Sequence, residues 1–521
     1  MPYISGGEIT NFPAESFVST VYKTCKQLGN KIFLEEEKLK KTYTYNDLHR
    51  MTCRVATTLK DMGVGPGKLV AFFGESSFQS FSIYFGVILT GGIISPYNPE
   101  LKEGEVSKML QVSRPTIIYC EKEEYLNTIN KSIEISGIKT KLLTATMFER
   151  LLVPYEKAKD YQPPVIADST KHTYLVLYTS GTTGVPKAVK LTDFSTNLQC
   201  HQLHWTTGHI LLTSPIFWVS NALVIGKCMV GGFTVLIPDK TDGENILRII
   251  QDYKITSWFT GPSLLLEMCA NLRKEIFKKY DTSSIELLFI GGTQILLEHR
   301  HLIRNTVFGG RNVLRLIYGA TECGIICQWS EQYDPEGPEY ASIGKIIKGS
   351  KIKVVDVETK KDLGPGQEGE IYVQSPCFMA GYMNEDLAEE ELKENDWWKM
   401  GDIGYYDDNG YLYFVSRMKD ILKYRGVQLA PSELEEILLQ HPAVAEACVV
   451  GKLHAIDGDQ PAAFVVKKLN TSVSEKELEE FVAARVPNSK RIRAGVHFID
   501  SIPKSAVGKY LSKSLLKLLE N

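Results

Sequence analysis

The stretch that decides the fold is LVLYTSGTTGVPK, which runs from Leu175 to Lys187. Its first half is apolar, as in a buried strand, and its second half is a loop of glycines and hydroxyl side chains that ends in a lysine. Glycines let backbone N–H groups approach a phosphate, hydroxyls donate further hydrogen bonds, and the lysine adds positive charge. Because a strand leads directly into it, we interpret this stretch as a phosphate-binding loop rather than as a flexible linker. It is not a GxxxxGK[ST] loop, since Ala188 follows Lys187.

The sequence before this loop alternates between helical and extended patterns. Apolar residues recur at helical spacing over 45–62 and again over 78–89, and short apolar runs at 69–74 and 116–120 predict strands. This rhythm of strand, helix and strand is typical of a parallel sheet covered by helices. We therefore expect an α/β fold.

The sequence from residue 370 onward carries a different pattern. Two predicted strands, 370–374 and 410–415, precede a charged run that begins at Ser416. An amphipathic segment and two apolar runs follow, at 432–440, 445–450 and 461–466. These elements are enough for a small α+β module, so we expect two domains, 1–416 and 417–521.

Composition restricts the class of protein. The chain has 521 residues and a formal net charge of -3, which gives no overall basic field of the kind that nucleic-acid binding needs. Its ten cysteines are scattered without a CxxC pair, so we expect reduced, mostly buried thiols and no zinc site. A lysine and several glycines interrupt the apolar stretch 208–238, which favours buried strands and helices over a membrane span. With no signal peptide and no SKL-type ending, the expected location is the cytoplasm.

Five motifs, in this order, resemble the signatures of the adenylate-forming superfamily. That superfamily includes acyl-CoA synthetases, 4-coumarate–CoA ligases, beetle luciferases and the adenylation domains of peptide synthetases. The motifs are the loop Tyr178–Lys187, YGATE at Tyr318–Glu322, GDIG at Gly401–Gly404, YLYFVSRMKDILKYRGVQLAP at Tyr411–Pro431 and IPKSAVGK at Ile502–Lys509. The resemblance implies a large multi-sheet N-terminal domain that binds AMP and a small, mobile α+β C-terminal cap.

The resemblance also implies roles in binding ATP. The loop hydroxyls and Lys187 would hold the β- and γ-phosphates, the turn at Gly291 and Gly292 would pack against the adenine, and Asp402 would accept the ribose hydroxyls. The full expected set is Thr179, Ser180, Gly181, Thr182, Thr183, Gly184, Lys187, Gly291, Gly292, Thr293, Tyr318, Gly319, Asp402 and Arg417.

Three of the matched residues are expected to be catalytic. Thr321 would contact the α-phosphate, and Glu322 would bind Mg²⁺, a hard cation that prefers oxygen ligands. Lys509 would lie between the α-phosphate and the attacking carboxylate. Attack at the α-phosphorus builds negative charge, so positioning and fixed positive charge are the catalysts that it needs.

The second half of the reaction is expected to use coenzyme A. Lys419 aligns with the family's hinge, and Lys423, Arg425 and Gly426 align with the segment that faces the site after the small domain rotates. Cations there would suit the phosphates of coenzyme A. The alternative is that 417–425 is only a solvated charged surface.

The expected acyl pocket consists of Phe217, Trp218, Ile325 and Ile326. Trp218 stands where peptide-synthetase domains carry Asp and where coumarate ligases and luciferases carry His, which argues against an amino-acid substrate. Two isoleucines after Cys323-Gly324 should narrow the cavity, so we expect a short-to-medium acyl chain or a compact aromatic acid. Alternatively, Trp218 is simply a large core aromatic.

We therefore expect an ATP-dependent acid–thiol ligase whose partners are a small carboxylic acid, ATP and coenzyme A. A luciferase-like monooxygenase, an enzyme that loads a carrier protein and a non-catalytic nucleotide-binding protein remain alternatives. Departures from the family pattern at Asp193, Leu316, Ile317 and Ser416 indicate a divergent branch. They raise the question of whether its activity is weakened.

Overall fold

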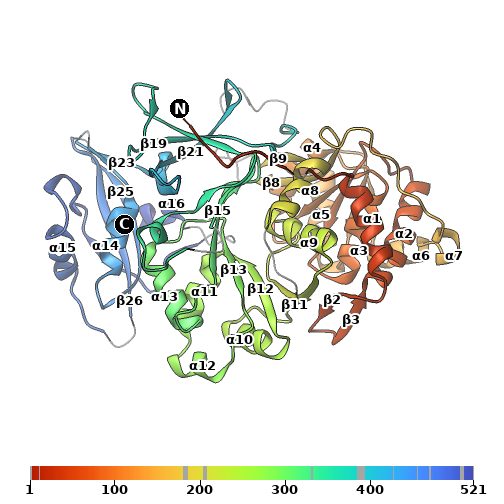
Figure 1. The fold of residues 1–521 in the computed structure, drawn as a ribbon, viewed down its shortest axis with the longest axis horizontal. Helices are drawn as coiled ribbons and strands as arrows, with labels where there is room; N and C mark the ends of the chain where they lie inside the picture. The colour runs from red at the N-terminus through yellow and green to blue at the C-terminus, as the bar shows by residue number, and fades with distance from the viewer. Residues whose placement is uncertain are drawn as a thin grey trace.

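The structure is a computed structural model, and the residues it describes are 3–10, 12–179, 186–203, 208–329, 333–383, 393–425, 427–454, 456–468, 471–504 and 510–519. Their strands form four sheets, each with helices or other sheets packed against it (Figure 1). The helices are α1 (Phe17–Leu28), α2 (Tyr45–Asp61), α3 (Phe78–Leu89), α4 (Glu103–Ser113), α5 (Leu126–Ser136), α6 (Ala145–Leu151), α7 (Tyr155–Ala158), α8 (Asp193–Gln202), α9 (Val219–Gly231), α10 (Gly243–Asp252), α11 (Pro262–Asn271), α12 (Lys274–Lys279), α13 (Leu297–Val307), α14 (Pro431–Leu439), α15 (Glu475–Ala483) and α16 (Ser512–Leu518).

A six-stranded sheet carries the start of the glycine-rich loop. Its order is β7 (Lys141–Thr144), β6 (Ile117–Cys120), β4 (Leu69–Phe73), β5 (Ile93–Tyr97), β8 (Thr173–Thr179) and β9 (Lys187–Thr192). All neighbours except β8 and β9 run parallel, which confirms the expected parallel sheet.

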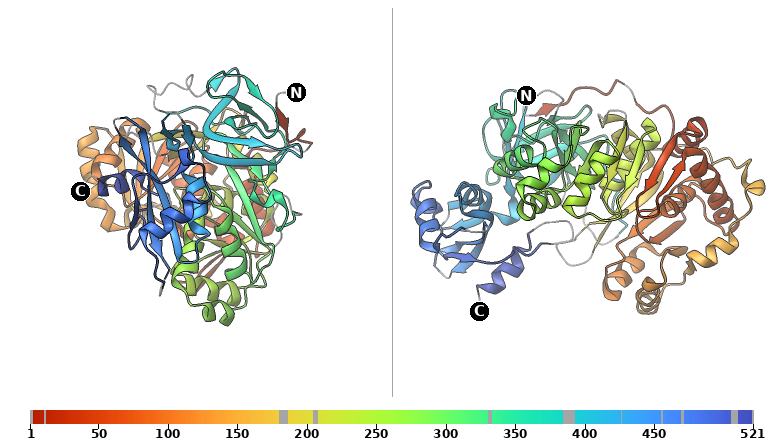
Figure 2. Two further views of the ribbon diagram at one scale, coloured as in Figure 1. Left: turned by 90° about the vertical axis from the view of Figure 1, so that its left-hand side faces the viewer. Right: turned by 90° about the horizontal axis from the view of Figure 1, so that it is seen from below.

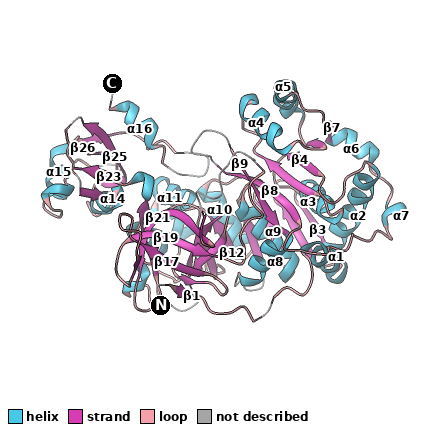
Figure 3. Cartoon of the chain, turned by 90° about the horizontal axis from the view of Figure 1, so that it is seen from above, coloured by secondary structure: helices cyan, strands magenta, loops and turns pink. Residues whose placement is uncertain are grey.

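Both faces of β4 are covered, which explains why its sequence is apolar without alternation. Leu69 and Phe73 pack in one cluster with residues of α4 and α5, whereas Val70 and Phe72 pack in another with residues of α2 and α3. Figure 3 shows these helices on the two sides of the strands.

A nine-stranded sheet forms the middle of the molecule. Its order is β16 (Lys345–Ile346), β15 (Gly324–Gln328), β14 (Leu314–Ala320), β13 (Leu287–Ile290), β12 (Ile255–Thr260), β10 (His209–Leu212), β11 (Thr234–Ile237), β2 (Ile32–Glu36) and β3 (Lys41–Thr44). The apolar stretch 208–238 supplies β10, α9 and β11, so its buried strands and helix are confirmed. Within the described residues, no helix combines the length and apolarity that a membrane crossing requires.

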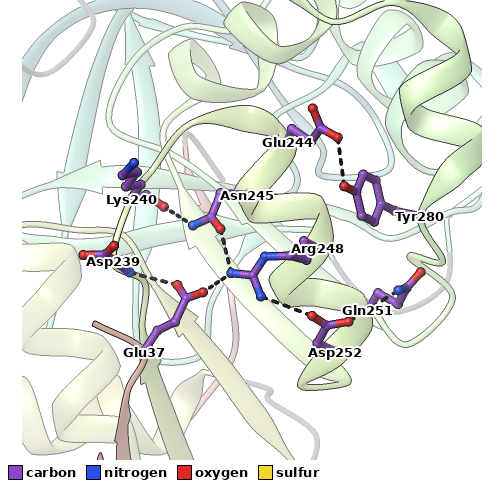
Figure 4. Close-up of polar contacts among 9 residues, drawn as sticks. All are labelled: Glu37, Asp239, Lys240, Glu244, Asn245, Arg248, Gln251, Asp252 and Tyr280. Atoms are coloured by element: carbon purple, nitrogen blue, oxygen red, sulfur yellow. Dashed lines mark hydrogen bonds and ion pairs between the residues drawn. The ribbon is translucent and has the colours of Figure 1, made fainter. Parts of the chain in front are cut away.

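A polar network joins the β2–β3 hairpin to α10 (Figure 4). The carboxylate of Glu37 forms an ion pair with the guanidinium of Arg248, and its second oxygen accepts from the backbone N–H of Asp239 at 2.9 Å. Arg248 also pairs with Asp252 at 3.1 Å. The network thus stabilises the β2–β3 edge of the central sheet, which is the edge opposite β14 and its YGATE motif.

A seven-stranded sheet follows, built from β1 (Ile4–Ser5), β17 (Lys351–Val355), β18 (Asp362–Leu363), β19 (Gly369–Gln374), β20 (Lys393–Glu394), β21 (Trp397–Tyr406) and β22 (Leu412–Arg417). The N-terminal strand β1 pairs with β17, so residues far apart in sequence share this sheet. The two predicted strands at 370–374 and 410–415 correspond to β19 and β22.

The C-terminal part contains β23 (Leu422–Tyr424), β24 (Val427–Leu429), β25 (Val444–His454), β26 (Gly458–Lys467) and β27 (Val496–Phe498) in a five-stranded sheet, with α14, α15 and α16 packed against it. It lies at the end of the molecule opposite α2 and α7, as Figures 1 and 2 both show. The seven-stranded sheet ends at Arg417 and the five-stranded sheet starts at Leu422, next to our proposed domain boundary.

Candidate active site

The glycine turn lies between two neighbouring parallel strands. β13 and β14 pair in parallel with Ile290 opposite Leu316, so Gly291 and Gly292 leave the sheet at the edge where Tyr318 lies. A Cβ on Gly291 would come within 3.0 Å of the carbonyl oxygen of Ile317, and Gly292 has a φ of +87°. Both positions therefore favour glycine, which brings the turn close against β14.

Tyr318, Asp402 and Arg417 meet where the central sheet joins the seven-stranded sheet. The phenol of Tyr318 donates to Asp402 Oδ2 at 2.6 Å, and Arg417 Nε pairs with Asp402 Oδ1 at 3.0 Å. Asp402 and Arg417 are Cα partners on β21 and β22, so strand pairing sets their contact. Burial and the charge of Asp402 raise the pKa of Tyr318, which keeps its O–H protonated as a donor.

The carboxylate of Asp402 is fully buried. A buried carboxylate is stable as an anion only when charges and donors compensate its lost hydration. Tyr318 and Arg417 supply that compensation from two different strands. The result is an oriented acceptor that suits hydroxyl donors.

Glu322 belongs to a second cluster at the same edge. Its Oε1 accepts from the hydroxyl of Tyr382 at 3.1 Å, and its backbone oxygen accepts from Met379 N at 2.8 Å. The Nζ of Lys187 lies 5.4 Å from the centroid of the Tyr382 ring. Tyr382 thus links the lysine of the glycine-rich loop to the carboxylate predicted to bind metal.

Tyr382 contacts two of the predicted site residues, although the sequence did not single it out. The only local signal is an aromatic residue after Gly381, which has a φ of +90°. Its segment is fixed by backbone bonds from Lys190 N to Gly381 O and from Met383 N to Ala188 O, at 3.0 and 2.9 Å. Such pairing between distant segments leaves no periodic trace in the sequence.

Gly319 and Thr321 lie in the turn from β14 to β15. Gly319 pairs with Ile325 beside a shift in register, and a Cβ on it would lie 2.1 Å from the carbonyl oxygen of Gly324. Thr321 is half-buried in this turn, and Thr293 is half-buried in the turn after β13.

Several expected site residues lie outside the described residues, namely Ser180, Gly181, Thr182, Thr183, Gly184, Gly426 and Lys509. The bases of two loops are nevertheless defined. Thr179 and Lys187 are Cα partners on β8 and β9. Lys504 and Tyr510 form a β-bridge around the terminal lysine loop, and Lys504 Nζ pairs with Glu446 Oε2 at 2.7 Å.

The residues expected to line the acyl pocket lie on two elements. Phe217 and Trp218 precede α9, with ring centroids 6.3 Å apart, and both are half-buried. Ile325 and Ile326 on β15 are buried in the main core cluster, against which Phe217 also packs. Gln199 of α8 fixes the backbone of this strand, since its Oε1 accepts from Ile325 N at 3.2 Å.

The basic residues expected to bind coenzyme A lie on the C-terminal domain. Lys419 and Lys423 are exposed. Arg425 is also exposed, and its Nε pairs with Asp457 Oδ1 at 2.6 Å. All three follow Arg417, the last residue of β22, in the chain.

The departures from the family pattern have structural roles. Asp193 is fully buried, and its two oxygens accept from Phe17 N and Val18 N at 2.7 and 3.2 Å. It therefore caps the N-terminus of α1, where a carboxylate is favourable. Burial raises the pKa of Asp193 to about 6, which those hydrogen bonds partly offset. Leu316 and Ser416 are buried, and Ile317 packs against the core.

Comparison with known proteins gives the same picture at the level of family. A model described as AMP-binding enzyme matches residues 21–383, and one described as AMP-binding enzyme C-terminal domain matches residues 433–509.

Individual relatives match over nearly the whole chain. The chain is 31% identical over 504 residues to a luciferin 4-monooxygenase of Nipponoluciola cruciata, covering 92% of this chain and 89% of the relative. It is 31% identical over 534 residues to a probable 4-coumarate–CoA ligase 2 of Dictyostelium discoideum, covering 96% and 95%. The fold matches ATP-bound MatB from Rhodopseudomonas palustris with a TM-score of 0.83 at 22% identity, over 97% of this chain and 99% of that one.

Proposed function

The chain belongs to the AMP-binding enzyme family of adenylate-forming enzymes, and from this premise we propose that it is an ATP-dependent carboxylic acid–CoA ligase. The observation that carries the proposal is the buried Asp402 carboxylate, held by Tyr318 at 2.6 Å and Arg417 at 3.0 Å. A carboxylate held by a hydrogen bond on one oxygen and by a guanidinium ion pair on the other is kept in a fixed orientation. Ribose hydroxyls of ATP would donate to its remaining lone pairs.

The residues present fit a Mg²⁺ ion that arrives with the nucleotide. Within the described residues no three or more His, Cys, Asp or Glu side chains cluster as a metal site. Mg²⁺ bound to ATP usually needs only one or two protein carboxylates, because phosphates and water complete its coordination. Glu322 would be that ligand, oriented by the Tyr382 hydroxyl. The ion would neutralise phosphate charge during transfer.

In the first step, a carboxylate oxygen of the acid attacks the α-phosphorus of ATP and pyrophosphate leaves. Lys187 and the loop hydroxyls would hold the departing phosphates, and Thr321 would orient the α-phosphate. Lys509 would place its ammonium between two anions that otherwise repel each other. In the second step, the thiolate of coenzyme A attacks the acyl carbon and AMP leaves.

The expected substrate is a short-to-medium acyl acid or a compact aromatic acid. Supporting this, Ile325 and Ile326 are buried in the main core cluster, and Phe217 packs against the same cluster. β-Branched side chains on a strand have few alternative rotamers, so they open little room for a long chain. A clear optimum with long-chain acids would contradict the assignment.

The experiment is acid-dependent pyrophosphate release with ATP and Mg²⁺ over a panel of acids, with and without coenzyme A. We expect release with one class of acid and formation of the matching acyl-CoA. Lys509→Ala should reduce pyrophosphate release by roughly 10²–10³-fold, the usual scale for loss of a group that stabilises transition-state charge. Unchanged release from this variant would refute the catalytic role of Lys509.

The kinship with a luciferin 4-monooxygenase makes a luciferase-like reaction the second candidate. Light emission with luciferin, ATP, Mg²⁺ and O₂ would favour it. Transfer of the acyl group to a carrier protein rather than to coenzyme A would favour the third candidate, an enzyme that loads a carrier.

A further inference from the structure

The turn that carries Thr321 and Glu322 lies beyond the pairing of β14 with β15. Ala320 and Gly324 are the last Cα partners of this hairpin, so residues 321–323 join the two strands. Backbone groups in such a turn have no partner in the sheet, and where the turn is buried they need hydrogen bonds from other segments. The bonds that hold this turn therefore also set the directions of the side chains that it carries.

One segment directly after β19 supplies three donors to this turn. Met379 N donates to the backbone oxygen of Glu322 at 2.8 Å, and the Tyr382 hydroxyl donates to Glu322 Oε1 at 3.1 Å. Ser375 Oγ donates to the backbone oxygen of Cys323 at 2.7 Å, across 52 positions of sequence. Both the backbone and the side chain of Glu322 are thus held from the seven-stranded sheet.

The hydroxyl of Ser375 has a fixed direction. Cys377 N donates to Ser375 Oγ at 3.0 Å, so one lone pair of this oxygen is already used. A hydroxyl carries a single hydrogen, and here that hydrogen points to the backbone oxygen of Cys323, which is fully buried. Because Ser375 contacts the turn through its side chain alone, its contribution can be removed while the backbone bond from Met379 stays.

The other end of the turn is held by α8. Gln199 is buried, its Oε1 accepts from Ile325 N at 3.2 Å, and its Nε2 donates to Ser195 O at 3.3 Å. Gly324 has a φ of +72°, and a Cβ on it would lie 2.7 Å from the amide carbon of Gln199. Two side chains from different layers, Ser375 and Gln199, therefore fix the turn at its two ends.

We propose that Ser375, together with Gln199, is a positioning residue for Glu322. Through the backbone of Cys323 and Ile325, the two side chains keep the turn in the orientation in which the Glu322 carboxylate can bind the metal ion of the nucleotide. This inference rests on the proposed function, because that function assigns Glu322 to Mg²⁺. Both residues lie outside the five motifs, and they act on the site only through the turn.

The test is equilibrium binding of ATP to the full chain by calorimetry, once with Mg²⁺ and once with EDTA. Ser375→Ala should weaken binding of the Mg²⁺ complex by about five-fold, the effect of one hydrogen bond, and leave binding of metal-free ATP unchanged. Ser375→Thr keeps the hydroxyl and should restore the wild-type affinity. Binding of Mn²⁺ in the presence of ATP, followed by its EPR signal, should show the same difference between the variants.

The matched control is Thr24→Val. Thr24 Oγ1 of α1 donates to Met229 O of α9 at 2.7 Å, so this variant loses a bond of the same kind and length between two other elements. It should bind both forms of ATP as the wild type does. Equal affinity of Ser375→Ala and the wild type for the Mg²⁺ complex would overturn the proposal, and so would equal weakening with and without Mg²⁺. If Ser375→Ala does not fold, Gln199→Leu decides, because it should show the same metal-dependent loss.

Pyrophosphate release separates this role from the proposed function. If the wild type releases no pyrophosphate with any acid but its affinity for the Mg²⁺ complex depends on Ser375, the proposed function fails and the positioning role stands. If release depends on an acid and the affinity for the Mg²⁺ complex does not depend on Ser375 or Gln199, the positioning role fails alone. A wild type that binds ATP equally well with Mg²⁺ and with EDTA would also overturn the positioning role.

Discussion

Asp402, which we propose as the ribose acceptor, illustrates what such a buried carboxylate needs. Its carboxylate is completely buried, so its charge depends on the Tyr318 hydroxyl and on Arg417. If either partner were removed, the buried carboxylate would be less stable as an anion, and its oxygens would be held less firmly in one orientation. Asp407 offers a contrast, since it accepts from Tyr413 at 3.2 Å in a half-buried turn at the far end of the β21–β22 hairpin.

We expect Tyr318→Phe to lower kcat/KM for ATP by about 10–100-fold, because a hydrogen bond to a charged group contributes about 1.5–3 kcal/mol. The measurement is pyrophosphate release at varied ATP concentration. Tyr413→Phe removes the same kind of contact from Asp407 and should leave kcat/KM unchanged. Equal effects of the two substitutions would show that Tyr318 acts only on general stability.

At the scale of elements, the candidate site depends on how closely β14 and β15 approach each other. The pairing of Gly319 with Ile325 leaves no room for a side chain, because a Cβ would lie 2.1 Å from Gly324 O. The close approach of the two strands therefore gives a packing reason for the glycine in the YGATE motif. Gly104 in α4 serves as a contrast, because a Cβ at that position would have no other atom within 4 Å.

We expect Gly319→Ala to lower the free energy of unfolding by more than about 2 kcal/mol and to abolish adenylation, since the clash is with backbone atoms that cannot move independently. Gly104→Ala should instead stabilise the protein by about 0.5–1 kcal/mol, because alanine loses less entropy in a helix. Chemical denaturation of both variants measures the difference. A stable, active Gly319→Ala variant would contradict this account of the hairpin.

For the whole molecule, the contact between the C-terminal domain and α13 involves acidic groups. Gln440 Nε2, directly after α14, donates to Glu298 Oε1 of α13 at 3.4 Å. At the start of α14, Ser432 Oγ donates to Val415 O of β22 at 2.8 Å. Burial first, and then the charge of Glu298, raises the pKa of Glu436 to about 7, while Arg300 opposes the shift. Glu433 on the same helix also repels Glu436 but pairs with Lys490 within its own domain.

From this raised pKa we expect the domain contact to depend on pH. A carboxyl group whose pKa is higher in the docked state favours docking when protonated, so its contribution is lost as pH rises from about 4.5 to about 7. We expect proteolysis at the 417–421 connection to accelerate over that range in the wild type, relative to Glu436→Gln. Glu433→Gln should keep the wild-type dependence. Parallel pH profiles for the wild type and Glu436→Gln would contradict this prediction.

The sequence by itself determined the fold class, the main strands and helices of both parts, and the family. Runs such as 69–74 and 78–89 encode which segments are extended or helical and which surfaces are apolar, because those properties depend on neighbouring residues. The motifs place the candidate ATP residues along the chain, although their roles remain predictions. Local patterns cannot say which distant segments meet.

Only the tertiary structure determines which of these distant segments are in contact. In the fold, Tyr382 lies between Lys187 and Glu322. Asp193 accepts a hydrogen bond at the N-terminus of α1. Arg425 and Arg493 both lie beside the ring of Tyr424. Each contact joins residues from elements that are far apart in sequence and depends on sheet order and register. The physical reason is that a side chain's partner is chosen by the packing of whole sheets and helices, whereas its own periodicity specifies only the face on which it lies.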